Sequence, residues 1–307
     1  MHDTPLVSFI LYTRNTEPSR LRECIESITS LSLSWREREI IVMDDASDST
    51  PLNGLSDCRD QILYIRLPYS GLAVARNMGL KMASGRFVQF LEADGRLIRA
   101  PYEHCLDIAR YHNPDIVLFK TTTRENNADV PFTYDGPENG SKYMCTHSLD
   151  TNNRYLFKQT MLGRLRFTEG STSEEDDFMP QLLLRSEQLF TTDSKAYLKT
   201  PTERTITEDE QERFFNDTER ALAHLQALVV PETDRAALQR QIAQLTMGYL
   251  QRIIKRTRSR RQLADAAKRL QAKGLYPLPD RNYSKQYTMF RKMMANGLTR
   301  RLLFLFN

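Results

Sequence analysis

Short apolar runs alternate with helical patterns over the first 120 residues. Five mainly apolar segments have the length of strands: 6–11, 40–43, 62–67, 87–91 and 115–119. Between them, apolar residues recur at helical spacing at 18–31, 72–82 and 102–111. This alternation predicts an α/β fold, with a mostly parallel sheet and helices on both faces.

The strand pattern stops near residue 205. Three amphipathic helices are expected beyond it, at 208–229, 233–255 and 259–273. A break rich in Gly and Pro at 274–279 precedes a last basic helical stretch at 283–306. We therefore predict two domains, an α/β domain at 1–205 and an all-α helical domain at 206–307.

The charge is divided between these domains. The net charge of the chain is +4, but residues 206–307 hold 19 Lys and Arg against 10 Asp and Glu, a net of +9, which leaves −5 for residues 1–205. The extreme is 251–301, with 15 basic and 2 acidic residues. This division suggests two different tasks. The overall composition, 40% hydrophobic and 27% charged, excludes collagen-like and disordered chains.

The four cysteines are scattered and form no CxxC pair, which predicts reduced thiols and neither a zinc site nor a disulfide framework. No run of about 18 uncharged apolar residues is present, so no membrane span is expected. The first residues lack the pattern of a secretory signal. We expect a cytoplasmic protein.

Two of the expected strands run directly into carboxylates, Asp44 and Asp45 after the second, and Glu92 and Asp94 after the fourth. Ligands of open parallel sheets bind at the carboxyl ends of the strands. A carboxyl-x-carboxyl triplet suits a hard divalent cation. The alternative is that these acids only form turns.

Two further features carry candidate chemistry. Arg76 lies one turn into the helix of the GLAVARNMGL segment, where its guanidinium would contact phosphate or ribose, or form a salt bridge with a neighbouring acid. No GxGxxG loop follows the first strand, which disfavours a dinucleotide site. Four acids at 174–177 precede an apolar helical segment. One of these carboxylates could serve as a general base, or the four could interact with the dipole at the N-terminus of the helix.

Taken in order, five segments resemble the family 2 inverting glycosyltransferases of GT-A fold, of the bacterial surface-polysaccharide type: VSFILYTRN, EIIVMDDAS, GLAVARNMGL, GRFVQFLEADG and RFTEGSTSEEDDF. The resemblance covers about residues 5–200. It implies a GT-A fold, a UDP-sugar donor and a glycan or lipid-linked acceptor. The reaction it implies is a single displacement that transfers a hexosyl or N-acetylhexosaminyl group with inversion.

The resemblance also implies roles for individual residues. Asp45 would contact the uracil base, helped by Tyr12 and Thr13, and Arg76 would lie against the uridine or the diphosphate. Glu92 and Asp94 would occupy the metal-binding triplet for Mn²⁺ or Mg²⁺.

On the acceptor side, the resemblance gives Asp176 the role of catalytic base. Glu169 and Glu175 would line the acceptor position.

The chain departs from the family pattern at three places. At the end of the first strand, Tyr12 and Arg14 replace the common Pro and Tyr, and the aromatic-rich segment often found after the last helix is reduced to 196–199. The triplet begins with Glu92 where Asp is usual, and Gly95 follows it where another Asp is usual. The changes in the triplet region motivate a second hypothesis, a catalytically degenerate module that binds the donor without turning it over.

The basic region 251–306 ends in apolar and aromatic residues, which suits the anionic surface of a membrane and predicts peripheral attachment to its inner face. The alternatives are that the apolar end packs on a partner subunit of a homo-oligomer, or that the basic face is only solvated. Nucleic-acid binding through this charge is a third hypothesis for function, but no recognised nucleic-acid-binding motif accompanies it.

Overall fold

The structure is a computed structural model that describes residues 4–124, 131–149, 153–200 and 207–304. The chain divides into two compact units. Residues 1–140, 150–170 and 185–205 form the first, and residues 141–149, 171–184 and 206–307 form the second. The domain boundary predicted at residue 205 lies outside the described residues.

The first unit is built on a sheet whose parallel half is the one expected from sequence. Strands β1 (Val7–Thr13), β2 (Arg38–Asp45), β3 (Leu63–Leu67) and β4 (Phe87–Glu92) are parallel and lie in the order β3-β2-β1-β4. Their carboxyl ends therefore share one edge, where Asp45 and Glu92 are found. The predicted α/β fold with helices around a parallel core is confirmed.

The other half of the sheet is mixed. β8 (Asn153–Lys158) pairs antiparallel with β4, and the order continues through β6 (Ile116–Thr122), β9 (Leu189–Leu198) and β5 (Arg96–Leu97). β7 (Tyr134–Glu138) pairs with β9. Of these strands, only β6 was predicted from the sequence.

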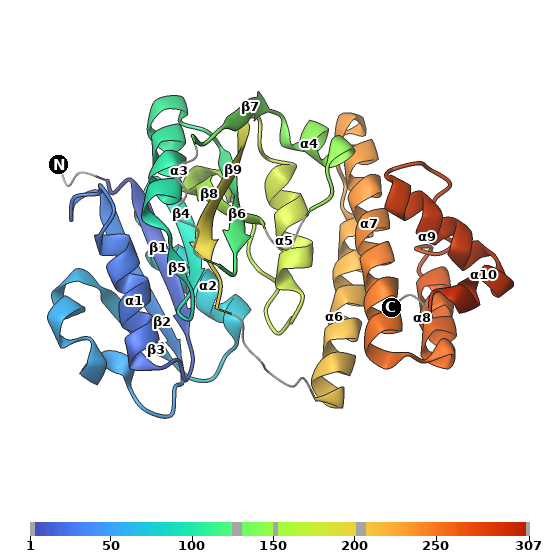
Figure 1. Ribbon diagram of the computed structural model, residues 1–307, viewed down its shortest axis with the longest axis horizontal. Helices are drawn as coiled ribbons and strands as arrows, with labels where there is room; N and C mark the ends of the chain where they lie inside the picture. The colour runs from blue at the N-terminus through green and yellow to red at the C-terminus, as the bar shows by residue number, and fades with distance from the viewer. Residues whose placement is uncertain (1–3, 125–130, 150–152, 201–206, 305–307) are drawn as a thin grey trace. The chain divides into compact units, whose positions relative to one another are not determined.

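Helices cover both faces of the sheet (Figure 1). α1 (Pro18–Thr29) and α3 (Arg99–His112) pack on the face that carries Phe9 and Val42. α2 (Leu72–Met82) packs on the opposite face, where Gly79 lies against Ile10. Alternate residues of β1 thus serve both layers, because successive side chains of a strand point to opposite faces. Short 3₁₀ helices occur at Pro51–Gly54, Ser56–Gln61 and Gln159–Met161.

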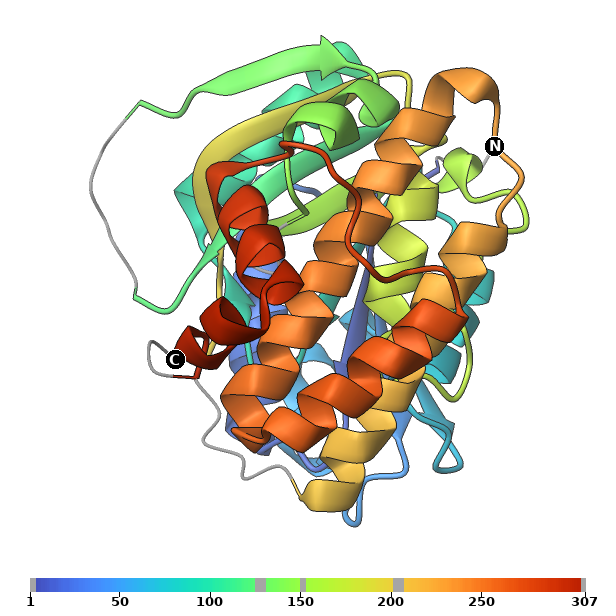
Figure 2. The ribbon, with the colours of Figure 1, turned by 90° about the vertical axis from the view of Figure 1, so that its right-hand side faces the viewer.

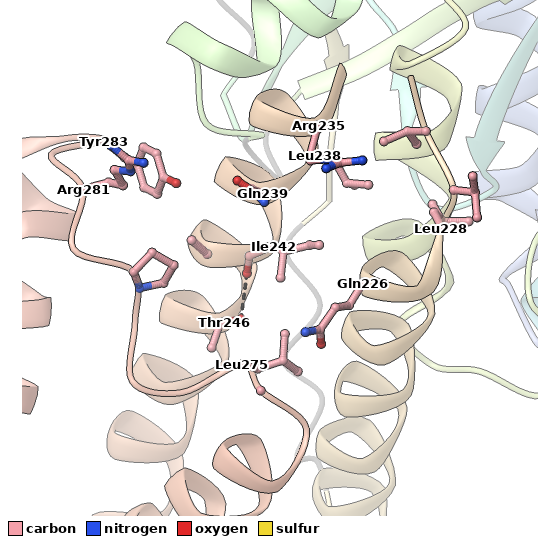
Figure 3. A pocket seen from close by; sticks show the side chains of 15 residues that line it. Gln226, Leu228, Arg235, Leu238, Gln239, Ile242, Thr246, Leu275, Arg281 and Tyr283 are labelled. Carbon is pink, nitrogen blue, oxygen red and sulfur yellow. Dashed lines mark hydrogen bonds between the residues drawn. The ribbon is translucent and has the colours of Figure 1, made fainter. Parts of the chain in front are cut away.

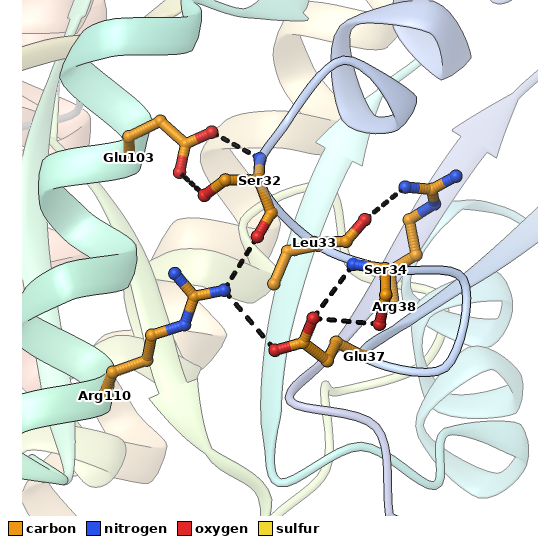
Figure 4. A network of polar contacts seen from close by, with 7 residues as sticks. All are labelled: Ser32, Leu33, Ser34, Glu37, Arg38, Glu103 and Arg110. Atoms are coloured by element: carbon orange, nitrogen blue, oxygen red, sulfur yellow. Dashed lines mark hydrogen bonds and ion pairs between the residues drawn. The ribbon is translucent and has the colours of Figure 1, made fainter.

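A polar network ties α3 to the connection between α1 and β2 (Figure 4). The Glu103 carboxylate accepts hydrogen bonds from the N–H and the hydroxyl of Ser32. The Arg110 guanidinium donates to the Ser32 carbonyl at 2.9 Å and reaches Glu37 at 3.5 Å. These contacts fix the loop that leads into β2, the strand that ends in Asp45.

The second unit is helical (Figure 2). Its helices are α4 (Gly140–Thr146), α5 (Glu174–Leu183), α6 (Glu208–Ala227), α7 (Glu232–Thr257), α8 (Arg260–Ala272), α9 (Lys285–Ala295) and α10 (Gly297–Leu302). The helical stretch predicted at 283–306 consists of two helices in the described residues, because the chain leaves helical geometry at Asn296 before Gly297. Asn and Gly are poor helix formers. Residues 305 and 306 lie outside the described range.

A buried carboxylate joins three of these helices. Glu219 of α6 is 3% exposed and accepts hydrogen bonds from the Tyr249 hydroxyl of α7, and from Arg269 at 2.9 Å and Lys273 at 2.7 Å. Part of the basic stretch at 251–301 is therefore used inside this unit.

Leu303, in the apolar segment that follows Arg301, also packs internally, since it is 6% exposed and belongs to the core of the helical unit. Within the described ranges, no helix has both the length and the apolar character needed to cross a bilayer. Membrane attachment and subunit packing through 251–306 stay predictions.

Candidate active site

The carboxylate of Asp45 connects three elements of the first unit. It is fully buried at the end of β2 and accepts hydrogen bonds from the N–H groups of Ser70 at 2.7 Å and Gly71 at 3.0 Å. The Tyr12 hydroxyl, from β1, lies 3.2 Å from its second oxygen. Gly71 begins α2 with a φ of +89°, a conformation that favours glycine. Asp45 thus fixes the start of α2 against the ends of β1 and β2.

Aromatic and polar side chains surround this corner. Burial, and then the charge of Asp45, raise the pKa of Tyr12, so its phenol stays protonated and donates to Asp45. The Thr13 hydroxyl is buried and finds no hydrogen-bond partner within the described part of the chain. Arg14, one of the departures noted above, lies 4.0 Å over the ring of Tyr69. The corner therefore has an aromatic and cationic edge.

Arg76 is held inside the first unit by two aromatic rings. It is 5% exposed, and its guanidinium lies 5.5 Å from the ring centre of Phe90 and 5.1 Å from that of Phe167. Cation–π contacts of this kind stabilise a charged group away from bulk water. The charge of Arg76 acts on the next element of the site, because it lowers the pKa of Glu92.

The two acids of the triplet have different surroundings. Glu92 forms an ion pair with Arg154 of β8 at 2.8 Å. Burial alone would raise the pKa of Glu92, but the charges of Arg154, Arg76 and Lys199 outweigh it and hold the pKa below its usual value. For Asp94, burial and then the charge of Glu92 raise the pKa. Three cations thus surround two carboxylates at the end of β4.

The fit of a divalent cation rests on these two acids. Across the described ranges, no three His, Cys, Asp or Glu side chains converge to form a complete metal site. Glu92 and Asp94 offer the oxygen ligands that Mg²⁺ and Mn²⁺ accept. Mg²⁺ is commonly held by one or two carboxylates together with substrate phosphates. The residues present therefore fit a metal that arrives with a diphosphate, and the ion pair of Glu92 leaves Asp94 as the better ligand.

Gly95 has a steric reason to be glycine. A Cβ atom at this position would lie 2.1 Å from the hydroxyl oxygen of Tyr197 and 2.9 Å from the backbone oxygen of Leu198. Tyr197 is 1% exposed and donates to the Glu92 carbonyl at 3.2 Å. The Asp that usually follows the triplet in the family is therefore replaced by a glycine, which makes room for Tyr197.

Asn77 joins the α2 helix to the segment that contains Phe167 and Glu169. Its side chain accepts from the Phe167 N–H at 2.9 Å and donates to the Phe167 carbonyl at 3.0 Å. The amide also reaches the Glu169 carboxylate at 3.2 Å. Asn77 is 5% exposed, so this clamp is internal and positions Glu169, which is itself exposed.

The acid-rich turn begins α5 in the second unit. Ser173 is the N-cap residue, and Glu174 to Asp177 form the first turn. Asp177 is 3% exposed and lies 2.7 Å from the His224 ring of α6. The Asp176 side chain is 15% exposed and lies 3.9 Å from Arg252 of α7. Burial raises the pKa of Asp176, Arg252 opposes that rise, and Glu175 adds to it.

The structure thus groups the predicted residues by unit. In the first unit it brings Tyr12 to Asp45 and places Arg76 near enough to Glu92 for its charge to lower the pKa of that acid. Thr13 and Glu169 also lie in this unit, whereas Glu175 and Asp176 lie on α5 in the second unit.

Sequence reasoning missed three contributors. Arg154 lies on a strand that was not predicted, and Arg252 was counted as surface charge. Asn77 stood inside the quoted motif GLAVARNMGL, and its place beside Arg76 was the one available signal.

A cavity of about 670 Å³ lies within the second unit, between α6, α7 and the segment 274–283 (Figure 3). Its walls are mainly apolar, with Arg235 and Arg281 among the polar groups. No predicted site residue lines it, so it is separate from the site described above.

Known proteins are similar to part of this chain. It is 26% identical over 184 residues to the minor teichoic acid biosynthesis protein GgaB of Bacillus subtilis, covering 55% of this chain and 20% of GgaB. It is 24% identical over 193 residues to TarP, the poly(ribitol-phosphate) β-N-acetylglucosaminyltransferase of Staphylococcus aureus, covering 59% and 58%. Two other curated relatives are matched over 34% and 33% of their length, so the chain spans a minor part of GgaB and of these two.

Solved structures share the fold. S. aureus TarS in complex with UDP-GlcNAc superposes with a TM-score of 0.60 at 17% identity, over 95% of this chain and 92% of that one. The mannosyltransferase PcManGT of Pyrobaculum calidifontis, in complex with GDP-Man and Mn²⁺, gives 0.61 at 16% identity, over 98% and 87%. These likenesses confirm the predicted fold.

The sequence profile described as "Glycosyl transferase family 2" matches residues 8–169, which is more than half of the chain. This region contains the Asp45 corner, Arg76 and the Glu92–Asp94 triplet. The chain belongs to glycosyl transferase family 2.

Proposed function

We propose that the protein is an inverting glycosyltransferase that moves a sugar from a UDP-sugar to a glycan or lipid-linked acceptor in the synthesis of a surface polysaccharide. The observation that carries this proposal is the cluster at the end of β4, where Arg76, Arg154 and Lys199 surround Glu92 beside Asp94. A cluster of mixed charge at the carboxyl edge of a parallel sheet suits a diphosphate and its metal.

The nucleotide would bind at the Asp45 corner. A carboxylate has about four acceptor positions, and those of Asp45 are approached by the N–H groups of Ser70 and Gly71, the Tyr12 hydroxyl and, at 3.3 Å, the Ser70 hydroxyl. The N–H of a uracil ring would take the position of the Ser70 hydroxyl, which can donate to the Pro68 carbonyl instead. Tyr12 and Tyr69 offer aromatic surface for the base and the ribose.

The diphosphate would lie beside Arg76 and Arg154, with a divalent cation held by Asp94 and assisted by Glu92. When bound, the metal neutralises the charge that develops on the leaving diphosphate. The guanidinium of Arg76 adds a fixed positive charge that costs no reorganisation during the reaction, because Phe90 and Phe167 hold it in place.

Asp176 would act as the general base. It would accept the proton of the acceptor hydroxyl as that oxygen attacks the anomeric carbon, on the side opposite the leaving UDP. One displacement then inverts the anomeric centre. A pKa raised by burial brings the carboxylate closer to the range that favours general base catalysis near neutral pH.

UDP-GlcNAc is the first donor to test. TarS has been crystallised with UDP-GlcNAc, and TarP is named for β-N-acetylglucosaminyl transfer to poly(ribitol-phosphate). By analogy, we propose an N-acetylhexosaminyl donor and a surface-polymer acceptor for this chain. Mn²⁺ is the first metal to test, since the structure of PcManGT contains it together with the donor.

A panel of nucleotide sugars tests the proposal. We expect UDP release from one or a few UDP-sugars in the presence of Mn²⁺ and loss of that release with EDTA, with GDP-sugars as the matched control. Calorimetry with UDP and Mn²⁺ runs in parallel. Metal-enhanced UDP binding without turnover of any donor would favour the degenerate binding module. Absence of both would overturn the proposal.

A further inference from the structure

We propose that the C-terminal helices position the catalytic base, Asp176. Asp217 of α6 fixes the turn that precedes α5, and the positive charge of Arg252 of α7 stabilises the ionised carboxylate of Asp176. This inference rests on the proposed function, in which Asp176 removes the proton of the acceptor. All the residues involved belong to the second unit.

Asp217 holds the segment just before α5. One of its carboxylate oxygens accepts from both the N–H and the hydroxyl of Thr172, each at 2.8 Å. The other oxygen forms an ion pair with Arg220. The side chain of Asp217 is completely buried, so these bonds have no competition from water. Burial would raise its pKa, but the hydrogen bonds from Thr172 and Arg220 lower it, and Asp217 is ionised at neutral pH.

The next residues are tied to the same helix. The hydroxyl of Ser173, the N-cap residue of α5, lies 2.8 Å from the hydroxyl of Thr218. On the other side of Asp176, the carboxylate of Asp177 lies 2.7 Å from the His224 ring. Contacts to α6 therefore flank Asp176 in sequence, which fixes the direction in which its side chain leaves the helix.

Arg252 approaches Asp176 from α7. Its guanidinium lies 5.0 Å over the ring of Phe214, and this stacking limits the orientations it can take. The closest approach of Nη1 to the Asp176 carboxylate is 3.9 Å. This separation is too long for a hydrogen bond but short enough for a strong charge interaction. Arg252 thus favours the ionised carboxylate without occupying the oxygen that must receive a proton.

The charges around Asp176 determine the direction in which its pKa changes when Arg252 is removed. Glu175, on α5 itself, favours the protonated form, whereas Arg252 favours the ionised form. On α6, His224 contacts Asp177. Removing Arg252 therefore raises the pKa of Asp176. A base must be ionised to act, so the acidic limb of the rate profile should move to higher pH.

The first test changes Arg252. We expect the R252Q variant to shift the acidic limb of kcat upward by about one pH unit, with the KM for the donor unchanged. R252K should restore the profile, because it restores the charge. R256Q is the matched control, since Arg256 is exposed one turn further along α7, and its profile should equal that of the wild type.

The second test changes Asp217. We expect D217A to lower kcat by about 10- to 100-fold, because a misplacement of about 1 Å costs on this scale. The KM for the donor should stay constant. D217N keeps one acceptor oxygen and should recover part of kcat. The control is D209A, at an exposed acid of the same helix. If D217A does not fold, D217N and the Arg252 variants decide the outcome.

The D176N variant separates this inference from the proposed function. If D176N transfers sugar at the wild-type rate, the assignment of the base fails. If D176N is inactive while R252Q keeps the wild-type pH profile, or D217A and D217N keep the wild-type kcat, the positioning role is overturned.

Discussion

Replacing Gly95 by Asp would restore the acid that the family usually has after its metal-binding triplet. If Gly95 were only a lost metal ligand, the G95D variant should bind Mn²⁺ and UDP more tightly. The structure leads to the opposite expectation. A Cβ atom at this position would lie 2.1 Å from the Tyr197 hydroxyl oxygen and 2.4 Å from the ring carbon that carries it.

These distances set the magnitude of the effect. A Cβ essentially never approaches another heavy atom within 3.0 Å, so Tyr197 must move or the backbone must shift. Tyr197 is a large, fully buried side chain, and the backbone oxygen of Leu198 at 2.9 Å blocks the alternative. Overpacking of this kind costs about 1–3 kcal/mol. For a chain of this size, we expect the melting temperature to fall by several degrees, about 2–4 °C for each kcal/mol.

Thermal unfolding and calorimetry with Mn²⁺ and UDP provide the assay. The matched control is G248D, because a Cβ at Gly248 meets nothing within 4 Å. In a double-mutant cycle, Y197A should reduce the cost of G95D, since it removes the obstacle. A G95D variant that is as stable as the wild type and binds the metal more tightly would refute the steric account of Gly95.

Two further predictions concern buried polar groups of the first unit. N77A should lower the free energy of unfolding by about 2 kcal/mol, because it leaves the N–H and carbonyl of Phe167 without their partner; denaturant titration measures it, and an unchanged midpoint would contradict it. R154M should destabilise the protein more at pH 7 than at pH 4. The pKa of Glu92 is lowered in the folded state, so its contribution is present above its unfolded pKa and is lost as the pH falls; equal losses at both pH values would contradict this.

Most of the parallel half of the sheet could be predicted because β1, β2 and β4 are buried on both faces. Each contains an apolar segment that can be recognised without a partner. β9 could not be recognised in this way, because it carries buried polar residues such as Thr192 and Ser194 and pairs with strands from distant parts of the chain. The helical stretch at the end of the chain could be predicted, but its division at Asn296 could not, because that break is a single local signal.

The residues of the candidate site also differ in whether they could be predicted from the sequence. Asp45, Glu92 and Asp94 were predicted because they follow strands of the predicted parallel sheet. The carboxyl ends of such strands share one edge, so the position of an acid in the sequence indicates where it lies in the fold. Arg154 could not be predicted, because its antiparallel strand carried no clear pattern. Arg252 is one of the 15 basic residues in the stretch 251–301. Only the packing of α7 near α5 distinguishes it from the others, because that packing brings it to Asp176.

The central claim is that Asp176 acts as the base of a sugar transfer whose donor binds in the first unit. The most direct measurement compares D176N with the wild type, for transfer from the active UDP-sugar and for UDP affinity in the presence of Mn²⁺. We predict that kcat falls by at least about 100-fold, because a general base contributes about 10²- to 10⁴-fold, while UDP affinity stays within about twofold. A D176N variant with wild-type transfer would contradict the claim.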